Sequence, residues 1–158
     1  MQYLNDLIHN RMLITAVLGW AVAQVVKTII DCGINKKINI ERLVGSGGMP
    51  SCHSSTVCAL CVGAGMEYGL DSSAFALAAI LAIIVMYDAR GVRRETGTQA
   101  EILNQMMDFF RLHENGEFKL EFNQEQLKVL IGHTPLQVIC GAILGIIVGV
   151  ISLNVLPV

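Results

Sequence analysis

Four mostly apolar stretches alternate with polar segments along the chain, at about residues 12–34, 54–70, 72–87 and 137–156. A helix needs about 20 apolar residues to cross the hydrocarbon core of a bilayer. The first and last stretches reach this length. The two middle ones are short, which suits a thinned or protein-lined passage. The pattern therefore predicts four spanning helices.

The segment between the third and fourth stretches is long and polar. Thr98 and Glu101 stand in the register of a capping box, which predicts a helix start there. The apolar residues that follow recur at helical spacing. They are Ile102, Leu103, Met106, Phe109 and Phe110. We expect an amphipathic helix that lies on the membrane surface or on the bundle, then a turn or hairpin at 113–122 and a short helix ending at Gly132.

Local signals mark the starts of the last two spans. Asp71 is the expected N-cap of the third span. Thr134, Pro135 and Gln137 predict a capping box with proline at the first helical position of the fourth span. Both spans should therefore begin sharply.

The fourth span carries a glycine stripe at four-residue spacing: Gly141, Gly145 and Gly149. Small residues on one helix face permit close contact with another helix. The partner of this stripe is either another span or another copy of the chain, so a homo-oligomer through the stripe is one expectation.

Composition agrees with a membrane location. Of 158 residues, 53% are hydrophobic and 15% are charged, whereas a soluble domain has about 25% charged residues. The length suits one domain, so we assign residues 1–158 to a single integral-membrane domain. Its expected fold is all-α, a polytopic helical bundle with about four spanning helices and an amphipathic surface helix.

Charge and cysteine usage narrow the functional classes. The net charge of −2 argues against nucleic acid as a partner. Little positive charge precedes the first span, so we expect it to be retained rather than cleaved as a signal peptide. Cys58 and Cys61 form a CxxC, but no second pair completes a zinc site. We expect no metal and no other cofactor.

Three polar clusters interrupt the apolar pattern. In the first, Gln24, Lys27 and Asp31 share one face of the first span because they are three and four residues apart. A charge inside a spanning helix is costly and suggests a function. The cluster is either a structural ion pair near the helix end or part of a ligand site.

The second cluster follows the third span in YDARGVRRETG, residues 87–97. Its arginines are either a basic flank that fixes orientation or an anion site. Arg93 and Arg94 stand between two glycines, as in a loop that wraps an anion, and a guanidinium matches phosphate geometry.

The third cluster consists of two histidines beside helix starts. His133 precedes the fourth span, where a helix N-terminus favours an anion. His53 lies in the first turn of the second span, after a glycine-rich turn and Pro50. Alone, each is an ordinary interfacial residue, but with the arginines they indicate a site. The first span ends where the second begins, and the third ends where the fourth begins. Lys27, Asp31, the arginines and both histidines should therefore converge at one membrane face.

At these residues the sequence resembles the type 2 phosphatidic acid phosphatase superfamily, which also contains the vanadium haloperoxidases, and in particular its short divergent branch of small membrane proteins. The resemblance covers nearly the whole chain and rests on GGMPSCHS, VMYDARGVRRETGTQA and GHTPLQV. PSCH (50–53) is similar to the motif P-S-G-H, with Cys52 in place of glycine. HTPLQ (133–137) is similar to H-x-x-x-D, with Gln137 in place of the carboxylate.

The resemblance implies metal-independent phosphoryl transfer. His133 would attack phosphorus and form a phosphohistidine, while His53 would protonate the leaving oxygen. The phosphate-binding residues that it implies are Lys27, Arg42, Gly47, Gly48, Ser51, Arg93 and Arg94.

A nucleophilic histidine needs an acceptor at its second ring nitrogen. Gln137 is one candidate, although its amide can instead close the capping box. Asp88 is the other candidate, although it can instead pair with Arg93 or Arg94.

The leading functional hypothesis is a membrane phosphatase that hydrolyses a lipid phosphate or lipid diphosphate. The alternative, which Gln137 favours, is a non-catalytic protein that binds or transports an anion or lipid phosphate. A vanadate-dependent haloperoxidase is a distant third. The expected partners are a membrane lipid phosphate and the bilayer.

Basic residues gather in the loops on the side of the site, whereas the opposite turn and the C-terminus have no lysine or arginine. This asymmetry predicts a multi-pass protein with a cytoplasmic site and both termini outside. The basic residues are Lys36, Lys37, Arg42, Arg90, Arg93, Arg94, Arg111, Lys119 and Lys128.

Overall fold

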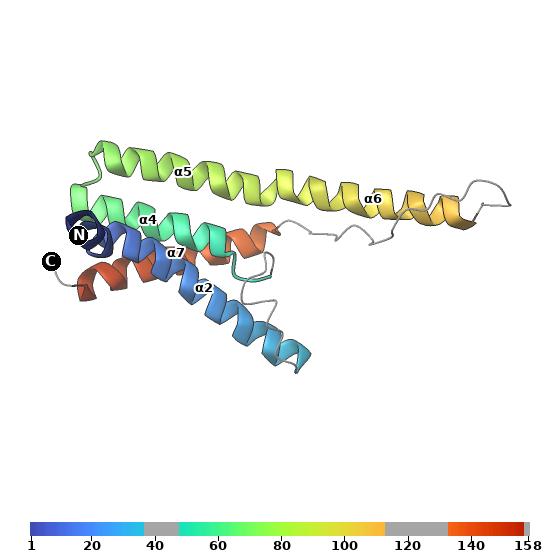
Figure 1. Ribbon diagram of the computed structural model, residues 1–158, viewed down its shortest axis with the longest axis horizontal. Helices are drawn as coiled ribbons and strands as arrows, with labels where there is room; N and C mark the ends of the chain where they lie inside the picture. Colours follow the sequence, from blue (N-terminus) through green and yellow to red (C-terminus); the bar gives the residue numbers. More distant parts are fainter. Residues whose placement is uncertain (37–47, 113–132, 157–158) are drawn as a thin grey trace.

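The computed structural model describes residues 1–36, 48–112 and 133–156, with the backbone alone at 92–96 and 108–112. Figure 1 shows the helices of this part of the chain, which contains no strand. They are α1 (Gln2–Ile8), α2 (Arg11–Asn35), α4 (Cys52–Tyr68), α5 (Ser73–Arg90), α6 (Val92–Leu112) and α7 (Pro135–Val155). The all-α prediction is confirmed. The four expected spans correspond to α2, α4, α5 and α7, and α1 was not predicted.

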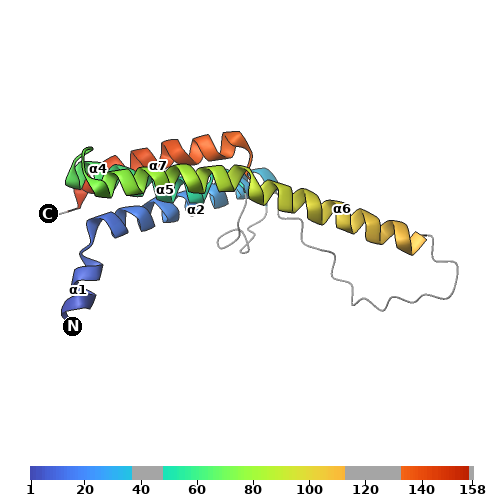
Figure 2. The same cartoon turned by 90° about the horizontal axis from the view of Figure 1, so that it is seen from above.

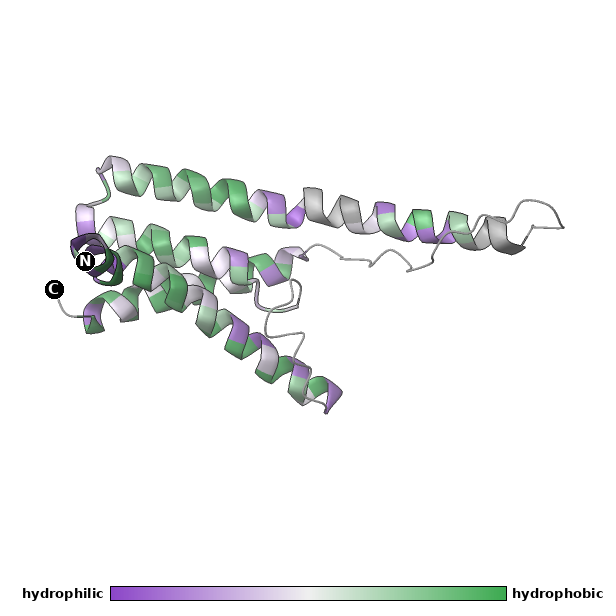
Figure 3. Ribbon diagram, viewed as in Figure 1, coloured by the Kyte–Doolittle hydropathy of each residue, from purple (hydrophilic) through white to green (hydrophobic). Residues whose placement is uncertain are grey.

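Three of these helices, α2, α5 and α7, are long and apolar enough to cross a membrane. Figure 3 shows the apolar residues covering most of α5 and much of α2 and α7. With 17 residues, α4 is about 25 Å long, less than the hydrocarbon core of about 30 Å. It packs against α2, α5 and α7, so the short helix is enclosed by protein, as its short apolar stretch suggested.

The glycine stripe of α7 packs against α4. A Cβ atom at Gly141 would collide with the Ser51 carbonyl, and one at Gly145 would collide with the Ser55 carbonyl. At Gly149 a Cβ would lie 2.9 Å from Val62 Cβ. The partner of the stripe is therefore another span of the same chain. A homo-oligomer remains a prediction, and it would need a different face.

The contact between α2 and α4 is equally close. A Cβ at Gly19 would lie 2.7 Å from Ala59 Cβ, and the buried Ser55 hydroxyl donates to the Gly19 carbonyl at 2.8 Å. The absence of a side chain at Gly19 thus lets the Ser55 hydroxyl of α4 form its hydrogen bond with the backbone of α2. The hydroxyl needs no water at this depth.

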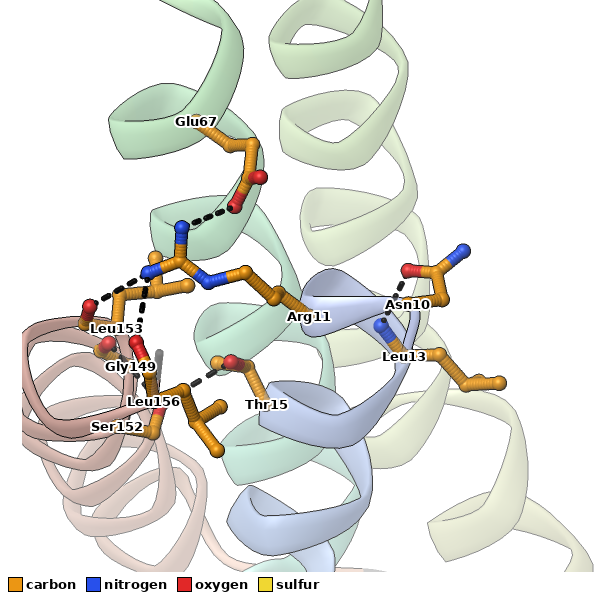
Figure 4. Close-up of polar contacts among 9 residues, drawn as sticks. All are labelled: Asn10, Arg11, Leu13, Thr15, Glu67, Gly149, Ser152, Leu153 and Leu156. Carbon is orange, nitrogen blue, oxygen red and sulfur yellow. Dashed lines mark hydrogen bonds and ion pairs between the residues drawn. The ribbon is translucent and has the colours of Figure 1, made fainter. Parts of the chain in front are cut away.

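The far end of the bundle is held by Arg11 (Figure 4). Its guanidinium donates to the carbonyls of Leu153 at 2.7 Å and Leu156 at 3.3 Å, and it lies 3.6 Å from the Glu67 carboxylate. One turn further along α2, Thr15 Oγ1 lies 3.0 Å from the hydroxyl of Ser152. The start of α2 is thereby tied to the ends of α4 and α7, and the carbonyls at the end of α7 gain a cationic donor.

Three local predictions need correction. The N-cap of α5 is Ser72, whose hydroxyl accepts from the Phe75 N–H at 3.1 Å, and not Asp71. The capping box at Thr98 is wrong because α6 already begins at Val92. The expected arginine loop is wrong for the same reason, since residues 93 and 94 lie in the first turn of α6.

The position of α6 excludes one of the two expected alternatives. Only Gly91 separates α5 from α6, and its N–H still donates to the Tyr87 carbonyl at 2.9 Å. The chain therefore re-enters a helix at once. Figures 1 and 2 show α6 extending away from the bundle in roughly the direction of α5, so the alternative position on the bundle is wrong, and a position on the membrane surface stays a prediction. The hairpin and helix expected at 113–132 lie outside the described residues.

Replacing Gly145 by alanine tests the packing of α7 on α4. The added methyl group must displace the backbone of α4 at Ser55, so Gly145→Ala should lower the free energy of unfolding by about 1–3 kcal/mol. Gly33→Ala is the matched control, because nothing lies within 4 Å of a Cβ at Gly33 in α2. Thermal unfolding of both variants in one detergent measures the difference. Equal stability of the two variants would contradict the packing.

Candidate functional site

Two histidines meet where α4 and α7 begin. The Ser51 N–H donates to the Gln137 carbonyl at 3.0 Å, and this backbone link sets the first turns of the two helices side by side. The ring centroids of His53 and His133 lie 5.6 Å apart with an interplanar angle of 63°. His133 is 3% exposed and His53 is half-buried. The edge-to-face arrangement is typical of rings in direct contact.

His133 is held from two sides. Its backbone N–H donates to the Ala89 carbonyl in the last turn of α5 at 3.1 Å. Its ring nitrogen Nδ1 lies 3.1 Å from Oε1 of Gln137. The ring is thus positioned by α5 and α7 together.

The side chain of Gln137 both closes the capping box and contacts the His133 ring, two roles that the sequence presented as alternatives. Its Oε1 accepts from the Thr134 N–H at 3.1 Å, and the Thr134 hydroxyl accepts from the Gln137 N–H at 3.4 Å. The predicted capping box is confirmed. The same oxygen faces Nδ1 of His133.

This shared oxygen fixes the tautomer of His133. A backbone N–H only donates, so the Gln137 atom that Thr134 contacts must be the amide oxygen. An oxygen without hydrogen cannot donate to the ring, so Nδ1 of His133 must carry the hydrogen. In the neutral imidazole Nε2 then keeps its lone pair. The neutral amide of Gln137 therefore orients this histidine in the way that a carboxylate acceptor would.

A buried lysine lies at the same end of the bundle. Lys27 in α2 is 2% exposed. Gly48 has φ +85°, and a Cβ there would lie 3.0 Å from Cδ of Lys27. Glycine suits this position because it adopts positive φ readily and leaves room for the lysine stem. The turn before α4 therefore packs directly on the basic residue of the first cluster.

Ser51 occupies a capping position. Its hydroxyl accepts from the Ser54 N–H at 3.4 Å as the N-cap of α4, and the residue is fully buried. The structure thus gives Ser51 a role at the helix start. A contact between Ser51 and phosphate stays a prediction.

The remaining candidate residues are placed less completely. Asp88 lies in the last turn of α5, next to Ala89 and therefore near His133. Arg93 and Arg94 belong to the first turn of α6, but their side chains are not among those described. Arg42 and Gly47 lie outside the described residues. Of the residues expected to converge, the structure thus places Lys27 and the two histidines at the same end of the bundle, and their roles stay predictions.

Sequence reasoning missed several contacts. Sγ of Cys52 lies 4.0 Å from Nδ1 of His53, and nothing in the spacing pointed to it beyond their adjacency. The ion pair of Arg11 with Glu67 was also missed. The alternation of spans, which predicted the convergence of the site residues, could also have predicted this ion pair, because the start of the first span and the end of the second lie on one membrane side. Within the described part of the chain, no three His, Cys, Asp or Glu residues group as metal ligands.

Fold and site together define a helical membrane protein with a histidine pair at one end of its bundle. The chain belongs to the divergent PAP2 family, whose model matches residues 8–148. The predicted resemblance is thereby confirmed, and the matched range includes every candidate residue of the site. The chain is also 40% identical over 147 residues to the uncharacterized membrane protein YuiD of Bacillus subtilis (strain 168), a match that covers 90% of this chain and 93% of that protein. No solved structure matches the chain.

The tautomer of His133 can be measured by 15N NMR on protein labelled at histidine. Neutral His133 should carry its hydrogen on Nδ1, and Gln137→Leu should abolish that preference because the amide oxygen is gone. Gln137→Glu is the matched control, since a carboxylate oxygen still accepts from Thr134 and from the ring. Signals are assigned by their loss in His133→Asn. A hydrogen on Nε2 in the wild type, or an unchanged tautomer in Gln137→Leu, would contradict the geometry.

Proposed function

We propose that the protein is a membrane phosphatase that hydrolyses a lipid phosphate or lipid diphosphate through a phosphohistidine. The observation that carries this proposal is the pair of imidazoles, His53 and His133, whose centroids are 5.6 Å apart. A nucleophile and a general acid at one site are what two-step phosphoryl transfer requires. Membership in the divergent PAP2 family supports the same class of chemistry by analogy.

In the proposed first step, Nε2 of His133 attacks phosphorus. The bond from phosphorus to the leaving oxygen breaks as the bond to Nε2 forms, and His53 gives its proton to the leaving oxygen. The hydrogen bond from Nδ1 of His133 to Oε1 of Gln137 holds the ring in place and keeps the hydrogen on Nδ1 during the attack. In the second step a water gives its proton to His53 and attacks phosphorus, which releases phosphate and restores His133.

The ring contact requires a movement in this mechanism. Two imidazoles in edge-to-face contact leave no room for a phosphoryl group between them. His133 is 3% exposed, whereas His53 is half-buried and has more room to turn. We therefore assign the movement to His53, whose side chain turns aside when the substrate binds.

The charge of the phosphoryl group needs cationic partners. Lys27, buried at this end of the bundle, is the described candidate. Arg42, Arg93 and Arg94 are the further candidates from the sequence. Cations in a site of low polarity stabilise developing negative charge more than cations in water do. A substrate with its tail in the bilayer suits a site built at the end of a membrane bundle.

A second candidate function is binding or transport of a lipid phosphate without turnover. The specific observation in its favour is that Gln137 contacts His133 through a neutral amide, which stabilises a charged imidazole less than a carboxylate does. Wild-type protein that binds the lipid phosphate but releases no phosphate would favour this function. It would be favoured further if Gln137→Glu then gained turnover.

Phosphate release from a panel of lipid phosphates and diphosphates by the purified protein, with a chelator present, tests the phosphatase. His53→Ala and His133→Ala should each cut the rate by about 10³-fold or more, because each removes a reacting group. His9→Ala is the matched control, since His9 lies beside α1 at the far end and is exposed. Unchanged turnover in both site variants would refute the assignment. Loss of activity in the chelator, restored by a divalent cation, would refute the metal-independent mechanism.

We also propose that the site faces the cytoplasm. In Figure 1 both termini lie at one end of the bundle, and the contacts of Arg11 with Leu156 and Glu67 belong to that end. The turn from α4 to α5 and the C-terminus lie there too and have no lysine or arginine. The positive-inside rule then places the opposite end, with the site, in the cytoplasm.

Single cysteines in a cysteine-free background test this orientation. An impermeant thiol reagent should label Asp71→Cys on intact cells and label Asn35→Cys only after permeabilisation. Both residues are exposed, Asp71 beside the start of α5 and Asn35 at the end of α2, so accessibility is matched. The reverse labelling pattern would place the site outside.

A further inference from the structure

Helix α1 lies at the end of the bundle opposite the histidine pair and turns away from α2. The Asn10 side chain caps α2 by accepting from the Leu13 N–H at 3.0 Å, with φ −72° and ψ 99°. This extended residue separates the two helices. Figure 2 shows α1 directed across the axis of α2 rather than along it.

The residues of α1 divide cleanly into two faces. On a helical wheel the apolar residues fall within an arc of about 140°. They are Tyr3, Leu4, Leu7 and Ile8. The other side of the wheel holds Gln2, Asn5, Asp6 and the adjoining His9.

The described part of the bundle does not cover the apolar face. Tyr3 is 90% exposed, Leu4 66%, Leu7 53% and Ile8 60%, and no residue of α1 is buried. Four large apolar side chains on one side of a short helix are costly to leave in water.

The depth of α1 is set by its neighbour Arg11. The guanidinium lies among the Glu67 carboxylate and the last carbonyls of α7, where the apolar part of the bundle ends. A polar layer of this kind belongs at the boundary between hydrocarbon and headgroups. A helix that leaves this level across the bundle axis runs along the membrane plane.

We propose that α1 docks on the bilayer, with Tyr3, Leu4, Leu7 and Ile8 in the acyl boundary of the leaflet opposite the site. The bilayer is favoured over a second protein because α1 is joined through only His9 and Asn10 to α2, a candidate membrane span whose first turns also expose apolar side chains, Leu13 at 42% and Val17 at 53%. The polar face of α1 then meets headgroups and water, as in other interfacial helices. This contact would hold the start of α2, and with it Arg11, at a constant depth. The proposal does not depend on catalysis.

Fluorescence quenching by brominated lipid tests this docking on the full chain. Trp20 is the single tryptophan and is 46% exposed in α2. Leu7→Trp and Asp6→Trp are made in a Trp20→Phe background and reconstituted in phosphatidylcholine and phosphatidylglycerol vesicles, with and without dibrominated phosphatidylcholine. The tryptophan at position 7 should be quenched about twofold or more above that at position 6. Wild-type protein, quenched through Trp20, is the positive control.

Equal quenching at positions 6 and 7 would overturn the proposal. A tryptophan at position 7 that emits as a buried residue, but is not quenched by brominated lipid, would also overturn it, because protein would then cover the face. If either variant fails to fold, the pair Leu4→Trp and Asn5→Trp gives the same comparison, since these residues lie on the apolar and polar faces.

Discussion

The close approach of α4 to α7 is the contact on which the rest of the structure depends. A helix of 17 residues is too short to cross a bilayer comfortably unless protein surrounds it. Here the glycines at 141, 145 and 149 bring the α7 backbone against the backbone of α4. Helices in lipid gain little from apolar burial alone, so tight van der Waals packing of this kind provides much of the association.

The same contact builds the site. With the helices this close, the Ser51 N–H reaches the Gln137 carbonyl, and the histidines beside the two helix starts, His53 and His133, are in contact. Gln137 then serves two purposes with one oxygen. One half of the helix cap and the orientation of His133 therefore share one oxygen, so removing the amide of Gln137 alters both.

Much of the fold could be predicted because membrane spans carry a strong signal. Length and apolarity located all four bundle helices, and Thr134, Pro135 and Gln137 marked the start of α7 to the residue. The connection after α5 was predicted wrongly because Thr98 and Glu101 match a helix start locally, while Gly91 lets a helix begin earlier. Local patterns do not reveal whether the preceding residues are already helical.

The gathering of the candidate site could also be predicted, since successive spans must alternate between membrane faces. The individual atomic contacts within the site could not be predicted. The dual role of Gln137 depends on the direction of one amide, and the pairing of Arg11 with Glu67 joins residues far apart in the sequence. Such contacts follow from packing in three dimensions, which spacing along one helix does not encode.

The single residue between α5 and α6 has a geometric consequence. α6 has 21 residues and is therefore a rod about 31 Å long, joined at Gly91 to the turn whose Ala89 carbonyl holds His133. The His133 group that the Ala89 carbonyl holds is the backbone N–H, so α6 is separated by only Arg90 and Gly91 from a residue that positions the main chain of this histidine. The direction in which α6 leaves α5 is therefore set at the same helix end that places His133.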